Sequence, residues 1–250
     1  MNILQNLKLV LEYDGTRYHG WQRQQNALTV QEVLEKTLNT IMKEDTKVTG
    51  CSRTDAGVHA KGFVCNFFTY TKIPVDRVPY ALNSVLPDDI VVLFCQRVSE
   101  DFHARYHARG KKYRYRIINR TFPSAFDKHY ACHFRYDLDV DKMKDAAKYL
   151  VGKHDFKAFM ATGSIVKDTV RTIFDISITQ NKQEILIDVT GDGFLYNMVR
   201  IIAGTLLYVG MSKIPVCDMA DIVLCGDRKK AGITAPPQGL YLMEVKYDDW

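Results

Sequence analysis

The order of strand and helix patterns along the chain constrains its fold more than any other feature. Segments that alternate apolar and polar residues are typical of strands, whereas apolar residues spaced three and four apart are typical of amphipathic helices. Both kinds of segment occur in each half of the chain, and this mixture predicts an α+β fold in which helices cover a mixed, mainly antiparallel sheet. The predicted strands are 7–13, 47–49, 62–68, 90–98, 111–118, 169–178, 184–190 and 241–247, and the predicted helices are 30–44, 76–86, 139–150, 196–209 and 216–224.

The length of the chain, 250 residues, fits one or two domains with a sizeable core. No linker stands out in the composition, but a boundary near residues 105–120 suits this length. We therefore expect an N-terminal half, 1–108, and a C-terminal half, 109–250. The stretch 121–136 has no clear periodicity and is expected to be a loop.

The composition is that of an ordinary globular protein, with 46% hydrophobic residues and a net charge of +5. No run of eighteen apolar residues occurs, so no membrane span is expected, and the first residues lack the pattern of a signal peptide. The cysteines have neither Cys-x-x-Cys nor zinc-ligand spacing. They are expected to be small buried side chains in a reducing cytoplasm, without disulfides or metal. They are Cys51, Cys65, Cys95, Cys132, Cys217 and Cys225.

Positive charge is concentrated in residues 103–116, where six of fourteen residues are Lys or Arg and none is acidic. In a strand the side chains alternate, so Tyr113 and Tyr115 share one face while Arg114 and Arg116 share the other with Lys112. Cations that neutralise phosphates and rings that stack on bases suit a nucleic acid. The alternative is a cationic edge strand protected against aggregation. We favour the nucleic-acid interpretation and expect Arg105, Arg114 and Arg116 to bind substrate.

A second polar segment, 51–60, lies between two predicted strands and holds the carboxylate of Asp55 two residues after Arg53. Gly57 lets the backbone turn tightly just beyond the acid. The segment is either a polar turn whose aspartate caps local N–H groups or a rigid mounting for a catalytic acid. Arg200, within an apolar helical segment, needs a partner, which is either a structural carboxylate or Asp55 itself.

Two further segments leave their roles open. Residues 18–25 are rich in aromatic and amide side chains, which is typical either of an exposed loop or of a probe that inserts into a polar partner. Residues 191–193 form a Gly-x-Gly sequence, but Tyr196 stands where a dinucleotide-binding loop needs a third glycine.

The segment from Arg53 to Ala60 resembles the catalytic motif of the TruA family of tRNA pseudouridine synthases. Ser52 departs from the family pattern, which commonly has glycine there; the acid, the cation and the following glycine are present. Further blocks resemble those of the family in the same order and cover nearly the whole chain. They are Tyr13-Asp14-Gly15 with Gly20-Trp21-Gln22, Phe102-His103-Ala104-Arg105, Lys112-Tyr113-Arg114-Tyr115, Gly193-Phe194-Leu195 with Met198-Val199-Arg200, and Ala235-Pro236 with Gly239-Leu240.

The resemblance implies the pseudouridine synthase fold, with two similar α/β halves and the active site in the cleft between them. It implies that a cytoplasmic homodimer isomerises uridine to pseudouridine in the anticodon stem-loop of tRNA, at positions 38, 39 and 40. In this reaction the N1–C1′ bond breaks, the uracil reorients, and C5 bonds to C1′. No metal, ATP or redox cofactor is needed, and the tRNA crosses both subunits.

The resemblance also implies roles for individual residues. Asp55 is the catalytic carboxylate, acting either as a nucleophile or as a base that removes a sugar proton. Tyr113 stacks on the flipped base and assists removal of the C5 proton, and Leu240 packs against the base. Arg53 holds the space or the phosphate of the flipped nucleotide. Arg200 pairs with Asp55 and keeps it ionised.

Two other classes of protein share some of these features. A non-catalytic RNA-binding module would use the basic segment, but it leaves Arg53, Asp55 and Arg200 without a purpose. A glycoside or nucleoside hydrolase would also act at C1′, but it usually needs a second carboxylate or a metal. No second acid stands out in the sequence.

Overall fold

The computed structural model describes residues 3–163 and 166–248, and the chain divides into two compact units. The first unit comprises Met1–Arg109 and Leu242–Trp250, and the second comprises Gly110–Tyr241. The last strand, β10 (Leu240–Lys246), begins in the second unit and continues in the first. The predicted halves differ from these units mainly in the assignment of the last residues. The division into an N-terminal half, 1–108, that carries the catalytic loop and a C-terminal half, 109–250, stays a prediction.

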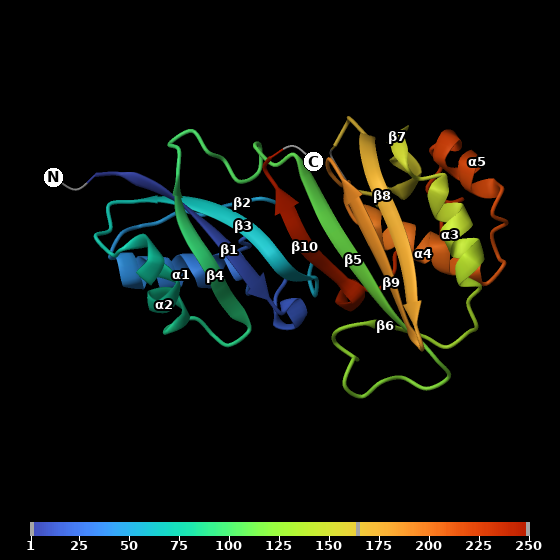
Figure 1. The fold of residues 1–250 in the computed structure, drawn as a ribbon, viewed down its shortest axis with the longest axis horizontal. Coiled ribbons are helices and arrows are strands. Elements are labelled where there is room, and N and C mark those ends of the chain that lie inside the picture. The colour runs from blue at the N-terminus through green and yellow to red at the C-terminus, as the bar shows by residue number, and fades with distance from the viewer. Residues whose placement is uncertain (1–2, 164–165, 249–250) are drawn as a thin grey trace. The chain divides into compact units, whose positions relative to one another are not determined.

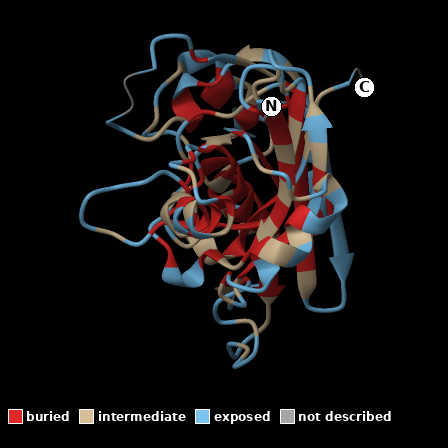
Figure 2. Ribbon diagram, turned by 90° about the vertical axis from the view of Figure 1, so that its left-hand side faces the viewer, coloured by how far each residue is buried: buried red, intermediate tan, exposed pale blue. Residues whose placement is uncertain are grey.

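The first unit contains an antiparallel sheet in the order β4-β1-β3, and β2 pairs with β3. Every second residue of β1 is fully buried, including Leu7, Leu9 and Leu11, because successive side chains of a strand point to opposite faces. Figure 2 shows such alternation as red and lighter segments along the strands. The elements are β1 (Gln5–Tyr13), α1 (Val30–Met42), β2 (Thr49–Gly50), β3 (His59–Thr69), α2 (Val78–Asn83) and β4 (Ile90–Val98).

The second unit contains an antiparallel sheet in the order β5-β9-β8-β7, with the short strand β6 parallel to β5. Figure 1 shows its helices lying against this sheet. The helix α4 is almost completely buried and supplies much of the core. The elements are β5 (Gly110–Asn119), β6 (Cys132–Phe134), α3 (Val140–Lys148), β7 (Gly152–Asp155), β8 (Val170–Asn181), β9 (Glu184–Gly191), α4 (Met198–Gly210) and α5 (Asp218–Cys225).

These elements confirm the predicted α+β class with a mainly antiparallel sheet. The strand predicted at 90–98 is β4 itself, and the helix predicted from residue 30 is α1, which Thr29 caps by accepting a hydrogen bond from the backbone N–H of Glu32. No helix among the described residues is long and apolar enough to span a membrane.

Several expectations were wrong in detail. The predicted loop 121–136 contains β6, which pairs with β5. The α-helix predicted at 76–86 covers only Val78–Asn83, and Val75–Arg77 before it form a 3₁₀ turn. The side chain of Asn83 bonds the backbone of Val92 in β4. Cys217 and Cys225 are exposed, whereas the other four cysteines are buried as expected; all six are free.

Candidate active site

The catalytic segment expected in the first unit is the connection between β2 and β3, residues 51–58, which we call the acid loop. The backbone N–H of Val58 donates to the carbonyl of Asp55 at 3.2 Å, closing a tight turn. Gly57 lies within this turn at φ +76°, a left-handed conformation that favours glycine. The Asp55 side chain is half-buried and Arg53 is exposed. The carboxylate therefore lies on a short, sharply turned loop between two paired strands.

The acid loop is held at three points by Tyr13, at the end of β1, and by Tyr18 and Trp21, which follow it; we call these three residues the clamp. The hydroxyl groups of Tyr13 and Thr54 are 2.8 Å apart and hydrogen bonded. The backbone N–H of Trp21 donates to the carbonyl of Thr54 at 3.2 Å, and that of Gly57 donates to the carbonyl of Tyr18 at 3.2 Å. Thr54 is thus bound through both its side chain and its backbone, immediately before the acid.

The aromatic residues of this clamp belong to the core. The Trp21 ring stacks on Phe63 with ring centroids 4.0 Å apart, and both Trp21 and Tyr18 are almost completely buried. The two interpretations of residues 18–25, an exposed loop or an inserting probe, are therefore wrong for these two rings. His19 and the amide-rich end of the segment, from Gln22 to Gln25, are exposed.

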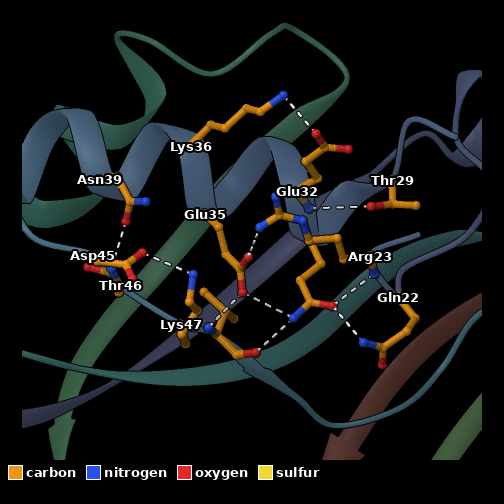
Figure 3. A network of polar contacts seen from close by, with 12 residues as sticks. Gln22, Arg23, Thr29, Glu32, Glu35, Lys36, Asn39, Asp45, Thr46 and Lys47 are labelled. Atoms are coloured by element: carbon orange, nitrogen blue, oxygen red, sulfur yellow. Dashed lines mark hydrogen bonds and ion pairs between the residues drawn. The ribbon is translucent and has the colours of Figure 1, made fainter. Parts of the chain in front are cut away.

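The buried carboxylate of Glu35, on α1, connects the residues just after Trp21 with the residues that lead into β2 (Figure 3). Glu35 accepts hydrogen bonds from the backbone N–H of Val48 and from the side chain of Gln31, both at 3.1 Å. The carboxamide oxygen of Gln31 in turn accepts from the side chain of Gln22 and from the backbone N–H of Arg23. Glu35 therefore fixes both the clamp and the residues that lead into β2 and the acid loop.

In the second unit, Tyr113 lies on the buried face of β5, opposite Val189 of β9. Its ring meets Phe194 edge to face, with centroids 5.1 Å apart and an interplanar angle of 83°, a favoured arrangement for two aromatic rings. The predicted alternation of β5 is confirmed, since Tyr113 and Tyr115 are buried while the intervening cations are partly exposed.

Arg200 is fixed near the start of α4 by two hydrogen bonds. Its Nη1 donates to Oδ1 of Asn197 at 2.6 Å, and its Nε donates to the carbonyl of Ala235 at 2.7 Å. The backbone N–H of Ala235 donates back to the carbonyl of Arg200 at 3.1 Å. The guanidinium is therefore a rigid part of the junction between α4 and the segment before β10.

The same segment is bonded to β5. The Tyr115 hydroxyl donates to the carbonyl of Pro236 at 2.8 Å, and burial raises the pKa of this phenol, so it remains a donor. Gly239 lies so close to the ring of Tyr115 that an added Cβ would be 2.8 Å from it. Leu240 follows, with 6% of its side chain exposed. Arg200 and Tyr115 thus belong to one hydrogen-bonded framework within the second unit. Tyr113 is on the same strand as Tyr115, and Leu240 follows the bonded segment.

The cations of β5 are paired with carboxylates. Asp188 of β9 accepts two hydrogen bonds from Arg114, at 2.7 and 2.8 Å, and pairs with Lys112 at 3.1 Å. Burial opposes ionisation of Asp188, but the hydrogen bonds from Arg114 and Lys112 outweigh it and lower its pKa. Arg116 pairs with Glu184 at 2.7 Å. Because β5 pairs with β9 on one side and β6 on the other, the alternative of a cationic edge strand is wrong.

Arg105, in the first unit, is exposed and lies over the ring of Tyr106 at 5.8 Å. The loop that carries it is anchored from β3, where the buried Asn66 accepts from the backbone N–H of Ala104 and donates to the carbonyl of Phe102.

Within residues 3–163 and 166–248, no three His, Cys, Asp or Glu side chains are grouped so that they could hold a metal ion.

The predicted site residues thus fall into two sets. Asp55, Arg53 and Arg105 belong to the first unit; Tyr113, Arg114, Arg116, Arg200 and Leu240 belong to the second. The sequence interpretation missed the contacts of the clamp with the acid loop and the role of Glu35 in fixing the clamp. The blocks that contain Tyr13 and Trp21 were visible as resemblances, but nothing in them indicated which backbone groups they bind.

Comparison with known proteins defines the class to which this α+β chain belongs. The family model described as tRNA pseudouridine synthase matches residues 9–107 and 146–248. The chain therefore belongs to the tRNA pseudouridine synthase family, and its members are isomerases.

Individual relatives match over nearly the whole chain. It is 54% identical over 244 residues to tRNA pseudouridine synthase A of a Thermoanaerobacter species, covering 98% of this chain and 100% of the relative. It is 53% identical over 245 residues to tRNA pseudouridine synthase A of Ruminiclostridium cellulolyticum, with the same coverage. A chain in the crystal structure of a Cbf5-Nop10-Gar1 complex is 12% identical with a TM-score of 0.42; the match covers 94% of this chain and 48% of that one.

Proposed function

We propose that this enzyme isomerises uridine to pseudouridine in the anticodon stem-loop of tRNA, at positions 38, 39 and 40, with Asp55 as its catalytic carboxylate and without a cofactor. Family membership and relatives named tRNA pseudouridine synthase A support the reaction and the tRNA substrate. The chemistry needs no oxidant or energy source, because the N1–C1′ bond that breaks is replaced by a C5–C1′ bond in the same nucleotide.

The main support for Asp55 as the catalytic carboxylate is the set of hydrogen bonds that fixes the acid loop. Thr54 is bound by Tyr13 through its hydroxyl and by Trp21 through its carbonyl. A catalytic group must be kept within about 0.5 Å of its productive position, and an ordinary capping turn needs no such attachment to a buried aromatic core. The structure therefore favours the catalytic interpretation of Asp55 over the polar turn. Arg53, exposed beside it, is proposed to hold the flipped nucleotide.

Tyr113 and Leu240 are proposed to receive the flipped base. A base within a stem has to be extruded before its C5 edge becomes accessible. The edge-to-face contact with Phe194 fixes the Tyr113 ring, so that ring offers a preformed stacking surface and places its hydroxyl for removal of the C5 proton. Leu240 is proposed to pack against the base.

Arg200 is proposed to pair with Asp55 and keep it ionised. Asn197 and Ala235 engage two of the five N–H donors of its guanidinium and set its plane. We propose that another of these donors serves Asp55.

Phosphate binding is proposed for Arg105, Arg114 and Arg116. Arg105 is exposed, whereas Arg114 and Arg116 retain about a third of their side-chain surface, 31% and 27%, beside their paired carboxylates. We also propose that the enzyme is a cytoplasmic homodimer and that the tRNA crosses both subunits, as the family resemblance implies.

The test is incubation with unmodified tRNA followed by mapping of pseudouridine. Wild-type enzyme is expected to form pseudouridine at positions 38–40 in the presence of EDTA, with an isolated anticodon stem-loop as a substrate that needs no magnesium for its tertiary fold. Asp55→Asn is expected to abolish turnover while the Kd for tRNA changes by no more than a few fold, because the cations are unchanged. Turnover of Asp55→Asn within tenfold of wild type would refute the role of this acid.

A further inference from the structure

The loop between β5 and β6, residues 120–131, presents aromatic rings to solvent, and we call it the aromatic loop. Figure 1 shows it extending beyond the end of β5. Phe126 is 90% exposed and Phe122 is 76% exposed. Single exposed apolar residues are common on protein surfaces, but two phenylalanines exposed on one loop offer aromatic surface that a partner can cover. The proposed chemistry uses neither ring.

The backbone of this loop is fixed by its own polar side chains. Arg120 donates from Nε to the carbonyl of Phe122 at 2.8 Å and from Nη2 to that of Pro123 at 3.0 Å. The hydroxyl of Ser124 donates to the carboxylate of Asp127 at 2.6 Å and accepts from the Asp127 backbone N–H at 3.1 Å. The carbonyls of Phe122 and Pro123 and the turn around Phe126 are therefore held in place.

The far end of the loop is tied to the framework of the second unit. The carbonyl of Tyr130 accepts from Nη1 of Arg116 at 3.1 Å and from the hydroxyl of Tyr241 at 2.7 Å. Arg116 also pairs with Asp127 at 3.4 Å. A loop with this many attachments presents its rings in a preordered state, which reduces the conformational entropy lost when a partner binds.

The charge around the rings is positive. Residues 120–137 contain three cations against two acids, and one of the acids, Asp127, is already paired with Arg116. Lys128 is exposed beside Phe126, and the exposed Arg135 lies over the ring of Tyr136 at 4.7 Å. Lysine is depleted at protein–protein interfaces, whereas exposed rings flanked by cations suit single-stranded nucleic acid.

We propose that the aromatic loop is a second tRNA-binding surface, on which Phe122 and Phe126 stack on unpaired bases while Lys128 and Arg135 contact phosphates. The inference rests on the proposed function only in that tRNA is the ligand. The loop lies within residues 108–145, between the two regions that the family model matches. The proposal is therefore based on the side chains of this loop and not on the match to the family model.

The experiment measures binding of unmodified full-length tRNA to the full chain in which Phe122→Ala and Phe126→Ala are combined. Stacking of one base on one ring contributes about 1–3 kcal/mol, so the Kd is expected to rise about tenfold or more. Phe126→Trp is expected to keep wild-type affinity, and Phe126→Leu to lose it, because leucine is apolar but cannot stack. Tyr80→Ala, which removes a 70% exposed ring from α2, is the matched control and is expected to bind normally.

The salt dependence of the Kd for tRNA distinguishes the contribution of the two rings from that of the cations. The double phenylalanine variant is expected to keep the wild-type slope of log Kd against log salt, whereas Lys128→Gln is expected to reduce it by about 0.7–0.9 for the lost phosphate contact. Unchanged Kd in the double variant, with an unchanged circular dichroism spectrum, would overturn the proposal. So would a change in the sedimenting mass of that variant without tRNA, because the loop would then bind a second copy of the chain.

Failure of the proposed function gives a different result. If wild-type enzyme binds tRNA but forms no pseudouridine in the anticodon stem-loop, the proposed reaction is refuted, while the binding comparison among loop variants still decides the role of the aromatic loop.

Discussion

Gly20 offers a sharp test of the clamp that holds the acid loop. It has φ +84°, and a Cβ added there would lie 2.2 Å from the carbonyl oxygen of Thr54 and 3.1 Å from the carbonyl carbon of Asp55. An ordinary C···O contact is about 3.3 Å or longer. In Gly20→Ala the Thr54 carbonyl therefore has to move by about 1 Å, and Asp55 moves with it.

The expected result is a selective loss of catalysis. A misplacement of about 1 Å can cost on the order of 10²-fold in rate, so kcat for pseudouridine formation is expected to fall at least that far. The Kd for tRNA is expected to stay within a few fold, because no cation is changed. The left-handed conformation alone costs an alanine about 1–2 kcal/mol. For a chain of this size, that lowers the melting temperature by roughly 2–8 °C, and the clash adds to the loss.

Gly163→Ala is the matched control. Gly163 has φ +87°, but an added Cβ there meets no atom within 4 Å. This variant therefore carries the same backbone strain without the clash, and it is expected to lose stability while keeping wild-type kcat. If Gly20→Ala keeps the kcat of Gly163→Ala at a temperature where both are folded, the clamp does not position Asp55 and the argument from its geometry is wrong.

Three further predictions concern the second unit and the cations. Tyr113→Phe keeps the ring and removes the hydroxyl, so turnover is expected to fall on the order of 10²–10⁴-fold with tRNA binding intact; a wild-type rate would leave the ring as a stacking surface only. Arg105→Gln is expected to reduce the salt dependence of tRNA binding by about 0.7–0.9, and Arg114→Gln by less, because Asp188 already offsets the Arg114 charge; equal changes would contradict this. The folded-state pKa of Asp188 is lowered from its ordinary 3.8, so its ionisation stabilises the fold above that pH and the contribution is lost as pH falls through the folded pKa. Wild type is therefore expected to be more stable than Asp188→Asn at pH 7, by an amount that shrinks below about pH 4; a difference that is constant with pH would refute this.

Local structure was predictable where a single segment carried its own signal. The run of β-branched and other apolar residues in 90–98 predicts β4 without any knowledge of its neighbours, because such side chains are enriched in strands. Thr29 and Glu32 predict the start of α1 for a similar reason, since capping involves groups within one turn. The bond between the Asn83 side chain and the backbone of Val92 was not predictable, because it joins α2 to another element.

The candidate site was predictable by residue type more than by environment. The segment containing Arg53, Asp55 and Gly57 could be selected from the sequence because its turn and its acid are close together in the chain. The charge of Arg114 could not be judged in this way, since the carboxylate that offsets it, Asp188, lies 74 residues away. A cation in the sequence shows that positive charge is present, but only the fold shows how much of it remains for a ligand.

The sequence by itself determined the α+β class, most of the strand and helix positions and the segment that carries the candidate acid, because each depends on residues that are neighbours in the chain. Only the tertiary structure decided that Trp21 packs on Phe63 and holds the carbonyl of Thr54. The same holds for the framework that joins Tyr115, Pro236 and Arg200 in the second unit. These contacts join residues far apart in the chain, and their energies come from packing and hydrogen bonds that exist only after folding.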